Sequence, residues 1–121
     1  MKYDDSNIFA KILRGEIPCK KIYEDEFVLS FYDINPQKKV HALVIPKGKY
    51  TDLDDFSSKA SSEEMVGLLK GINTVAKKLG ISTDTGKGYR ALANISEDGG
   101  QEVPHLHFHL FGGEKIGKMV Q

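Results

Sequence analysis

Residues 105–111 read His-Leu-His-Phe-His-Leu-Phe, a strict alternation of histidine with apolar side chains. A period of two is that of a β-strand, whose successive side chains point to opposite faces. The pattern therefore predicts a strand with Leu106, Phe108 and Leu110 in the core. Three imidazoles would line the other face, with neighbours about 6.6 Å apart. The fourth histidine of the chain, His41, precedes a second short apolar run.

An imidazole can be a nucleophile, a proton carrier or a metal ligand near neutral pH. A single histidine is often only structural, but three on one strand face would all need partners side by side. We therefore interpret this face as a reactive surface. The residues alone leave two chemistries open, a metal site and a metal-free nucleophile.

A metal site is the weaker of the two interpretations. His-x-His on a strand can hold zinc, and a three-histidine site would keep a water in the fourth position. However, three imidazoles on one straight strand span about 13 Å, too far for all of them to reach one ion at about 2 Å. The run contains no carboxylate or thiol, and the single cysteine, Cys19, is remote in sequence. We expect no metal and no cofactor.

Composition and charge exclude several classes of protein. A chain of 121 residues is expected to form one domain, residues 1–121. Its 17 basic and 17 acidic residues leave no net charge to attract nucleic acid. One cysteine cannot form an internal disulfide, which favours a reducing compartment. No apolar run resembles a signal peptide or approaches the roughly 20 residues of a membrane span. We expect a cytoplasmic protein with no membrane partner.

The order of elements indicates an α+β fold. A short N-terminal helix is expected after Ser6, ending at Gly15, and a long helix after Ser61, ending at Gly80. Ser61 and Glu64 have the spacing of a capping box. The other expected strands are 21–24, 27–32, 41–45 (stopped by Pro46) and 88–95, and residues 48–60 are expected to be a loop with one helical turn. Because the strands follow one another mostly without helices between them, we predict an antiparallel sheet of about five strands.

A glycine-rich loop, residues 96–102, leads directly into the histidine run. Glycines allow backbone N–H groups to approach an anionic oxygen closely, and Asn94 and Gln101 add neutral amide donors. Such a loop alone is more often an ordinary turn. Next to three histidines, it predicts a cradle for a developing negative charge.

The pattern His-φ-His-φ-His-φ-φ, where φ is apolar, is similar to the motif of the histidine-triad (HIT) superfamily. The segments 31–37, 41–47 and 98–101 and the pair Gly112-Gly113 resemble its Hint branch, in a form similar to bacterial members. This resemblance covers nearly the whole chain and implies a HIT-like fold built as a symmetric homodimer. We expect the long helix and the edge of the fourth strand at the dimer interface.

The resemblance implies a purine nucleoside phosphoramidase. Such a hydrolase cleaves the P–N or acyl-phosphate bond of purine nucleoside phosphoramidates or adenylates and releases a nucleoside monophosphate. His107 would be the nucleophile and form a covalent nucleotidyl-histidine. His109 would contact the phosphate and carry the proton of the leaving group or water. His105 and His41 would orient the ring of the nucleophile.

The resemblance also implies the residues that bind the nucleotide. Phosphate oxygens would contact Asn94, Gln101 and the backbone near Val103, and the ribose hydroxyls would contact Asp33. The purine base would lie against apolar side chains, namely Ile8, Phe9, Phe31, Ile34 and Leu43.

Two positions depart from patterns seen in relatives. Glu102 stands where eukaryotic members have serine, and an ionised carboxylate cannot donate to phosphate. Ala10 stands where some relatives have a zinc-binding cysteine. Two other functions stay open: a dinucleoside polyphosphate hydrolase of the same superfamily, which the intact His109 disfavours, and a non-catalytic nucleotide-binding dimer.

Overall fold

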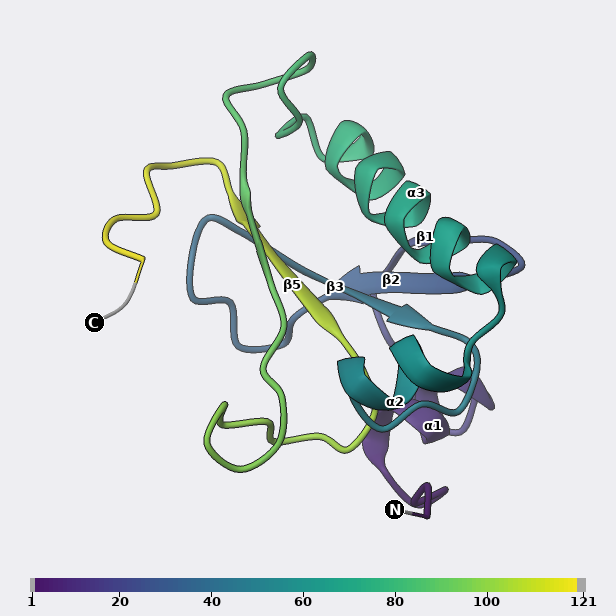
Figure 1. Cartoon of the computed structure of the whole chain (residues 1–121). Helices are drawn as coiled ribbons and strands as arrows, with labels where there is room; N and C mark the ends of the chain where they lie inside the picture. Colours follow the sequence, from purple (N-terminus) through teal and green to yellow (C-terminus); the bar gives the residue numbers. More distant parts are fainter. Residues whose placement is uncertain (1, 120–121) are drawn as a thin grey trace.

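The computed structural model describes residues 2–119, which form an antiparallel sheet with helices on both sides (Figure 1). The five strands of this part of the chain lie in the order β1-β2-β3-β5-β4. Each neighbouring pair is antiparallel. Their bounds are β1 Lys21–Glu24, β2 Val28–Tyr32, β3 Val40–Pro46, β4 Arg90–Leu92 and β5 Phe108–Gly112. The expected α+β fold with a five-stranded antiparallel sheet is confirmed.

The helices are α1 Ile8–Leu13, α2 Leu53–Lys59 and α3 Ser62–Lys78. The capping box of α3 is confirmed, because the Ser61 and Glu64 side chains each accept from the backbone N–H of the other residue. The expected cap of α1 is wrong by one residue. Asn7 accepts from the Ala10 N–H, whereas the Ser6 hydroxyl donates to Asp4.

Residues 48–60 contain more helix than the expected single turn. Asp52 caps the seven-residue helix α2 by accepting from the Asp55 N–H, and Phe56 anchors it in the core. Strand β3 also runs through Pro46, which pairs with Val28 rather than stopping the strand one residue earlier.

Two strands are shorter than expected. Strand β4 has three residues, Arg90–Leu92, instead of eight. It cannot include Gly88, whose φ of +92° does not fit a strand. Strand β5 begins only at Phe108. Before it, the His105 N–H bonds the Val103 carbonyl in a tight turn. The first half of the histidine run, residues 105–107, therefore lies outside the sheet ladder.

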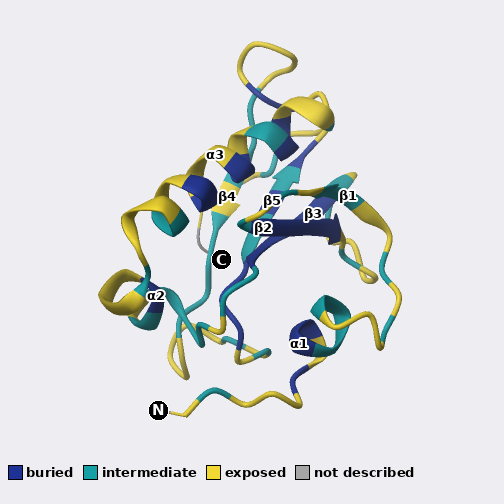
Figure 2. Cartoon of the chain, turned by 90° about the vertical axis from the view of Figure 1, so that its right-hand side faces the viewer, coloured by how far each residue is buried: buried dark blue, intermediate teal, exposed yellow. Residues whose placement is uncertain are grey.

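The two faces of the sheet carry two separate cores, and α3 and α1 lie on opposite sides of the strands (Figure 2). The first core lies under α3 and joins apolar residues of β2, β3, β5, the segment just before β5 and the two longer helices, namely Val28, Ala42, Val44, Phe56, Leu68, Ile72, Val75, Leu106 and Leu110. The second lies under α1 and comprises Phe9, Leu29, Phe31, Leu43 and Ile45. Because neighbouring residues of β2 and β3 alternate between the two cores, both faces of these strands are buried.

Helix α3 lies unusually close to β2. An added Cβ on Gly67 would come within 2.5 Å of the Phe27 ring, and one on Gly71 within 2.8 Å of Val28. Glycine at these two positions therefore lets the helix approach the sheet. In residues 2–119, no helix has the length and apolar character needed to cross a bilayer.

Candidate active site

All four imidazoles lie on the α1 side of the sheet. Leu106 and Leu110 belong to the core under α3, so the alternating histidines point the other way, as the sequence pattern predicts. The Phe9 ring of α1 contacts His107 edge-on, with ring centroids 4.9 Å apart. Leu43 of β3 pairs with His109 of β5, so their side chains lie on the same face of the sheet. His41 is two residues from Leu43 in the same strand and therefore points to that face as well. The tertiary structure thus adds the distant His41 to the histidine run.

His107 is held with a free lone pair on one nitrogen. Its Nδ1 lies 2.8 Å from the backbone carbonyl oxygen of His105. A carbonyl only accepts, so Nδ1 must carry the proton and Nε2 must be unprotonated in the neutral ring. The side chain is nearly buried, at 6% exposure. This is the tautomer that a nucleophilic Nε2 requires.

His105 has both ring nitrogens occupied by protein groups. Its Nε2 donates to the Pro46 carbonyl at 2.9 Å, which leaves Nδ1 as an acceptor. The Tyr3 hydroxyl donates to that Nδ1 at 2.6 Å. Sequence reasoning did not identify Tyr3, because it lies 102 positions from His105 and belongs to no recognisable motif. His105 itself has no exposed surface, so it cannot touch a substrate and can act only through its neighbours.

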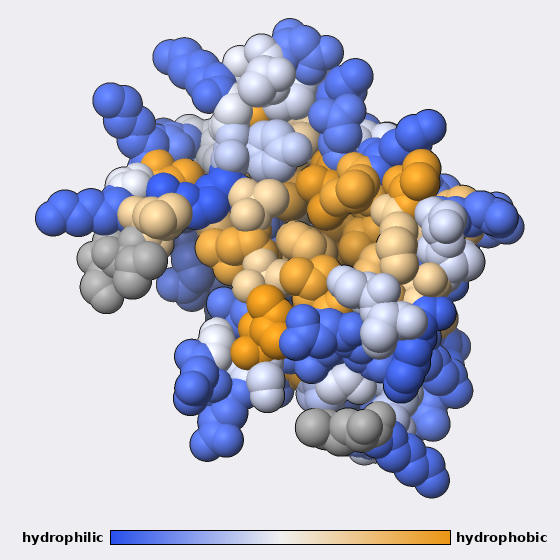
Figure 3. Space-filling view, viewed as in Figure 1, coloured by the Kyte–Doolittle hydropathy of each residue, from blue (hydrophilic) through white to orange (hydrophobic). Residues whose placement is uncertain are grey.

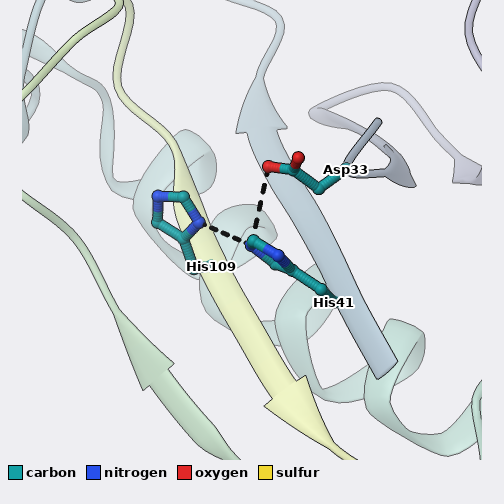
Figure 4. A group of neighbouring side chains, drawn as sticks. All are labelled: Asp33, His41 and His109. Atoms are coloured by element: carbon teal, nitrogen blue, oxygen red, sulfur yellow. Dashed lines mark hydrogen bonds and ion pairs between the residues drawn. The ribbon is translucent and has the colours of Figure 1, made fainter. Parts of the chain in front are cut away.

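His41, His109 and Asp33 form a second connected group (Figure 4). The backbone N–H of Gln37 donates to His41 Nδ1 at 3.1 Å, so the neutral His41 ring carries its proton on Nε2. That proton faces His109 Nδ1 at 2.9 Å, with the Asp33 carboxylate 3.6 Å from the same nitrogen. His109 Nδ1 is therefore an acceptor, and the neutral His109 ring carries its own proton on Nε2.

Among residues 2–119, the same three side chains form the group that could hold a metal ion. They offer ligand atoms that all lie within 4.8 Å of one another. A cation, however, would need the lone pair of His41 Nε2, and the Gln37 N–H keeps the proton on that nitrogen. The residues present therefore do not fit a metal ion without breaking the Gln37 contact.

Burial lowers the pKa of every imidazole in the site. For His105, burial lowers the pKa to about 4. For His109, burial together with the neighbouring rings of His107 and His41 also lowers the pKa to about 4. The pKa of His107 is lowered by burial, although the Asp33 and Glu102 carboxylates oppose the effect. All four rings are neutral at pH 7 as a result, which keeps the lone pair of the nucleophile available.

The side-chain amide of Gln101 forms hydrogen bonds with other groups of the protein. Its side-chain carbonyl accepts from the Ser96 N–H at 2.9 Å, and its amide nitrogen donates to the carbonyls of Thr51 and Val103 at 2.7 and 2.9 Å. Both amide hydrogens therefore have protein acceptors, and Gln101 ties the glycine-rich loop to the segment before α2. The phosphate-binding role expected for this residue stays a prediction. Asn94 lies half-buried two residues beyond β4.

The five apolar residues expected to contact the base divide into two groups. Phe9, Phe31 and Leu43 are core residues, each with at most 6% exposure. Ile8 and Ile34 are exposed, at 42% and 87%. Ile8 and Ile34 have exposed surface that a purine base could contact, whereas Phe9, Phe31 and Leu43 pack in the core under α1. The expected ribose ligand, Asp33, lies beside His41, and the backbone N–H of Asn35 donates to one oxygen of its carboxylate.

Comparison with known proteins identifies the family. The sequence model of the HIT domain matches residues 14–116. An uncharacterized 13.2 kDa HIT-like protein of Azospirillum brasilense is 53% identical over 118 residues, covering 98% of this chain and 94% of that protein. The purine nucleoside phosphoramidase of Escherichia coli K12 is 39% identical over 117 residues, covering 96% of this chain and 94% of the enzyme.

Solved structures agree with this result. A HIT family hydrolase from Clostridium thermocellum has a TM-score of 0.86 at 36% identity, covering 98% of this chain and 99% of that one. A histidine triad protein from Clostridium difficile has a TM-score of 0.80 at 41% identity, covering 98% of each chain. The chain belongs to the HIT domain family, and the resemblance drawn from its histidine motif is confirmed.

Proposed function

We propose that this protein is a hydrolase that cleaves the P–N or acyl-phosphate bond of purine nucleoside phosphoramidates or adenylates. The observation that carries the proposal is the tautomer of His107. The contact between its Nδ1 and the His105 carbonyl leaves Nε2 unprotonated, on a ring that burial keeps neutral. The similarity to the Escherichia coli phosphoramidase supports the choice of substrate class.

The proposed reaction has two displacements at the α-phosphorus. In the first, His107 Nε2 forms a bond to phosphorus, and the bond from phosphorus to the leaving nitrogen, or to the acyl oxygen of an adenylate, breaks. In the second, water attacks the same phosphorus, the bond to His107 breaks, and a nucleoside monophosphate is released. A covalent intermediate of this kind divides one difficult displacement into two easier ones.

His109 is the proposed proton carrier for both displacements. An anionic phosphate beside it favours the protonated ring, so His109 can give the Nε2 proton to the leaving amine and later recover one from the attacking water. When His109 Nδ1 is protonated, it no longer accepts from His41. The His41 Nε2–H then has the Asp33 carboxylate, 3.6 Å away, as its alternative acceptor.

Steady-state turnover of a fluorogenic adenosine phosphoramidate, measured beside a diadenosine polyphosphate, tests this function. We expect the phosphoramidate to have the higher kcat/KM. Preference for the diadenosine compound would instead favour a dinucleoside polyphosphate hydrolase. Tight AMP binding without turnover of either compound would favour a nucleotide-binding dimer.

The proposed assembly is a homodimer formed through α3 and β4. Strand β4 is an edge of the sheet and can pair with its copy across a two-fold axis. An apolar area lies beside α3 on the face that carries the β4 segment (Figure 3), and Leu69 of α3 is 67% exposed. We expect a sedimentation mass of two chains. Leu69→Glu should shift it toward one chain, whereas Lys70→Glu at the next position should not.

A further inference from the structure

We propose that Tyr3 is a positioning residue for the reaction, acting through His105 on the tautomer of His107. The inference rests on the proposed function, because it assigns a role in the same site. It concerns the N-terminal segment, to which neither the histidine motif nor the HIT domain match, residues 14–116, assigns a part.

The contact between Tyr3 and His105 is directional. His105 Nε2 donates to the Pro46 carbonyl, so its Nδ1 can only accept, and the Tyr3 hydroxyl must donate to it at 2.6 Å. The two rings also meet edge-on, with centroids 5.6 Å apart. Because His105 is completely buried, losing this donor would leave a polar nitrogen without a partner, a costly arrangement.

The contact with Tyr3 restrains His105, and the backbone of His105 in turn restrains the nucleophile. Its carbonyl oxygen accepts the His107 Nδ1–H, and that bond decides which nitrogen of His107 is free. Residues 105 and 106 lie outside the sheet ladder, and their N–H groups bond the carbonyls of Val103 and Tyr50. Tyr3 and Pro46 each form a hydrogen bond with one ring nitrogen of His105. These two bonds therefore help to hold the His105 carbonyl in place.

The segment that carries Tyr3 is itself well anchored. The Asn7 side chain donates to the Asp4 carbonyl at 2.7 Å. The Lys49 ammonium lies 2.8 Å from the Asp5 carboxylate, and Arg14 donates to the Asp5 carbonyl at 2.9 Å. Burial raises the pKa of Tyr3, so the phenol keeps the proton that it donates. These contacts orient the hydroxyl before any substrate binds, which reduces the entropy cost of the contact.

The first test is Tyr3→Phe, which keeps the ring and removes only the O–H. We expect kcat for the adenosine phosphoramidate to fall about tenfold, the scale of one lost buried hydrogen bond. KM should stay nearly unchanged, because in the proposed role Tyr3 acts through His105 and not on the nucleotide. Tyr23→Phe is the matched control. It removes a hydroxyl that bonds Asp25 at 2.7 Å, away from the histidines, and should leave kcat unchanged.

The second test reads the tautomer without any substrate. Long-range proton–nitrogen NMR correlations of the folded protein should place the His107 proton on Nδ1. In Tyr3→Phe, a population with the proton on Nε2 should appear. An unchanged His107 tautomer in that variant would overturn the proposal. If the tautomer shifts but the wild-type protein fails to hydrolyse the phosphoramidate, the positioning role stands and the proposed function fails.

The third test is a double-mutant cycle. If Tyr3 acts through His105, Tyr3→Phe should have little further effect on kcat once His105→Asn is present. Independent, multiplicative losses would mean that Tyr3 affects catalysis by another route and would contradict the assignment.

Discussion

The two faces of the sheet are built on different principles. The core under α3 consists of apolar side chains from both the helix and the sheet, such as Leu68 and Val75 of α3 and Leu110 of β5. The face under α1 combines an apolar cluster with the buried polar rings of His41, His105 and His107. Each of those rings has a specific hydrogen-bond partner.

Because of this difference, substitutions on the two faces should affect different properties of the protein, its stability on the α3 side and its turnover on the α1 side. Apolar burial is roughly proportional to area and has no direction, so on the α3 side apolar substitutions that conserve volume should cost little, whereas those that remove buried area should cost more. Buried polar rings depend on each partner, because an unpaired buried nitrogen is costly. Changes on the α3 side should therefore lower the free energy of unfolding, whereas small changes on the α1 side should lower turnover first.

The largest expected effect is that of His107→Asn on the α1 side. It keeps an amide near the size of the ring but removes the nucleophilic nitrogen, so kcat should fall by several orders of magnitude, with little change in nucleotide affinity. His105→Asn and His41→Asn should cost less, since each only orients a ring. A quenched wild-type reaction should also trap acid-labile AMP on the protein. Near-normal turnover of His107→Asn, or AMP on His109, would mean that the roles are assigned wrongly.

On the α3 side, Leu68→Ala should lower the free energy of unfolding by roughly 2–5 kcal/mol, since it removes a buried side chain and leaves a cavity. Urea unfolding measures this effect, and kcat of the folded variant should stay near the wild-type value. Lys70→Ala, an exposed position two residues along α3, is the matched control and should change stability little. A large loss of kcat in folded Leu68→Ala would show that the two faces are coupled.

Acid should lower the free energy of unfolding, because the unfolded chain binds protons more readily than the buried imidazoles of the α1 side. The folded pKa of His105 is about 4, below the unfolded value of about 6.5, so the unfolded chain binds protons first as the pH falls. The contribution of this ring is fully present above about pH 6.5 and is lost progressively down to about pH 4, by up to ~3 kcal/mol. The difference in unfolding free energy between wild type and His105→Asn, followed over this range, isolates the effect. A difference independent of pH would contradict it.

The smallest expected effect is that of metal removal. Dialysis against a strong chelator should leave turnover unchanged, because the Gln37 N–H holds the proton of His41 on the nitrogen that a cation would need. The measurement is kcat before and after dialysis, with and without added Zn²⁺. Activity that is lost and then restored by Zn²⁺ would show that Asp33, His41 and His109 bind a catalytic ion.

The local features of the fold could be read from the sequence. Alternation in residues 105–111 assigned the histidines and the leucines to opposite faces, and the Ser61–Glu64 spacing identified the start of α3. These features depend on the geometry of a few consecutive residues, which is the same in any protein. The late start of β4 could not be read in this way, because the left-handed conformation of Gly88 is a property of the backbone that no apolar pattern records.

The protonation pattern of the site was decided only by the tertiary structure. The sequence by itself determined that three imidazoles share one face with Leu106 and Leu110 behind them, since side-chain direction along a strand is a local property. It could not determine which nitrogen of each ring carries the proton, because that depends on partners from distant segments. Tyr3 and Pro46 decide it for His105, and Gln37 decides it for His41. Hydrogen bonds of this kind form only when the folded chain brings these groups within about 3 Å of each other.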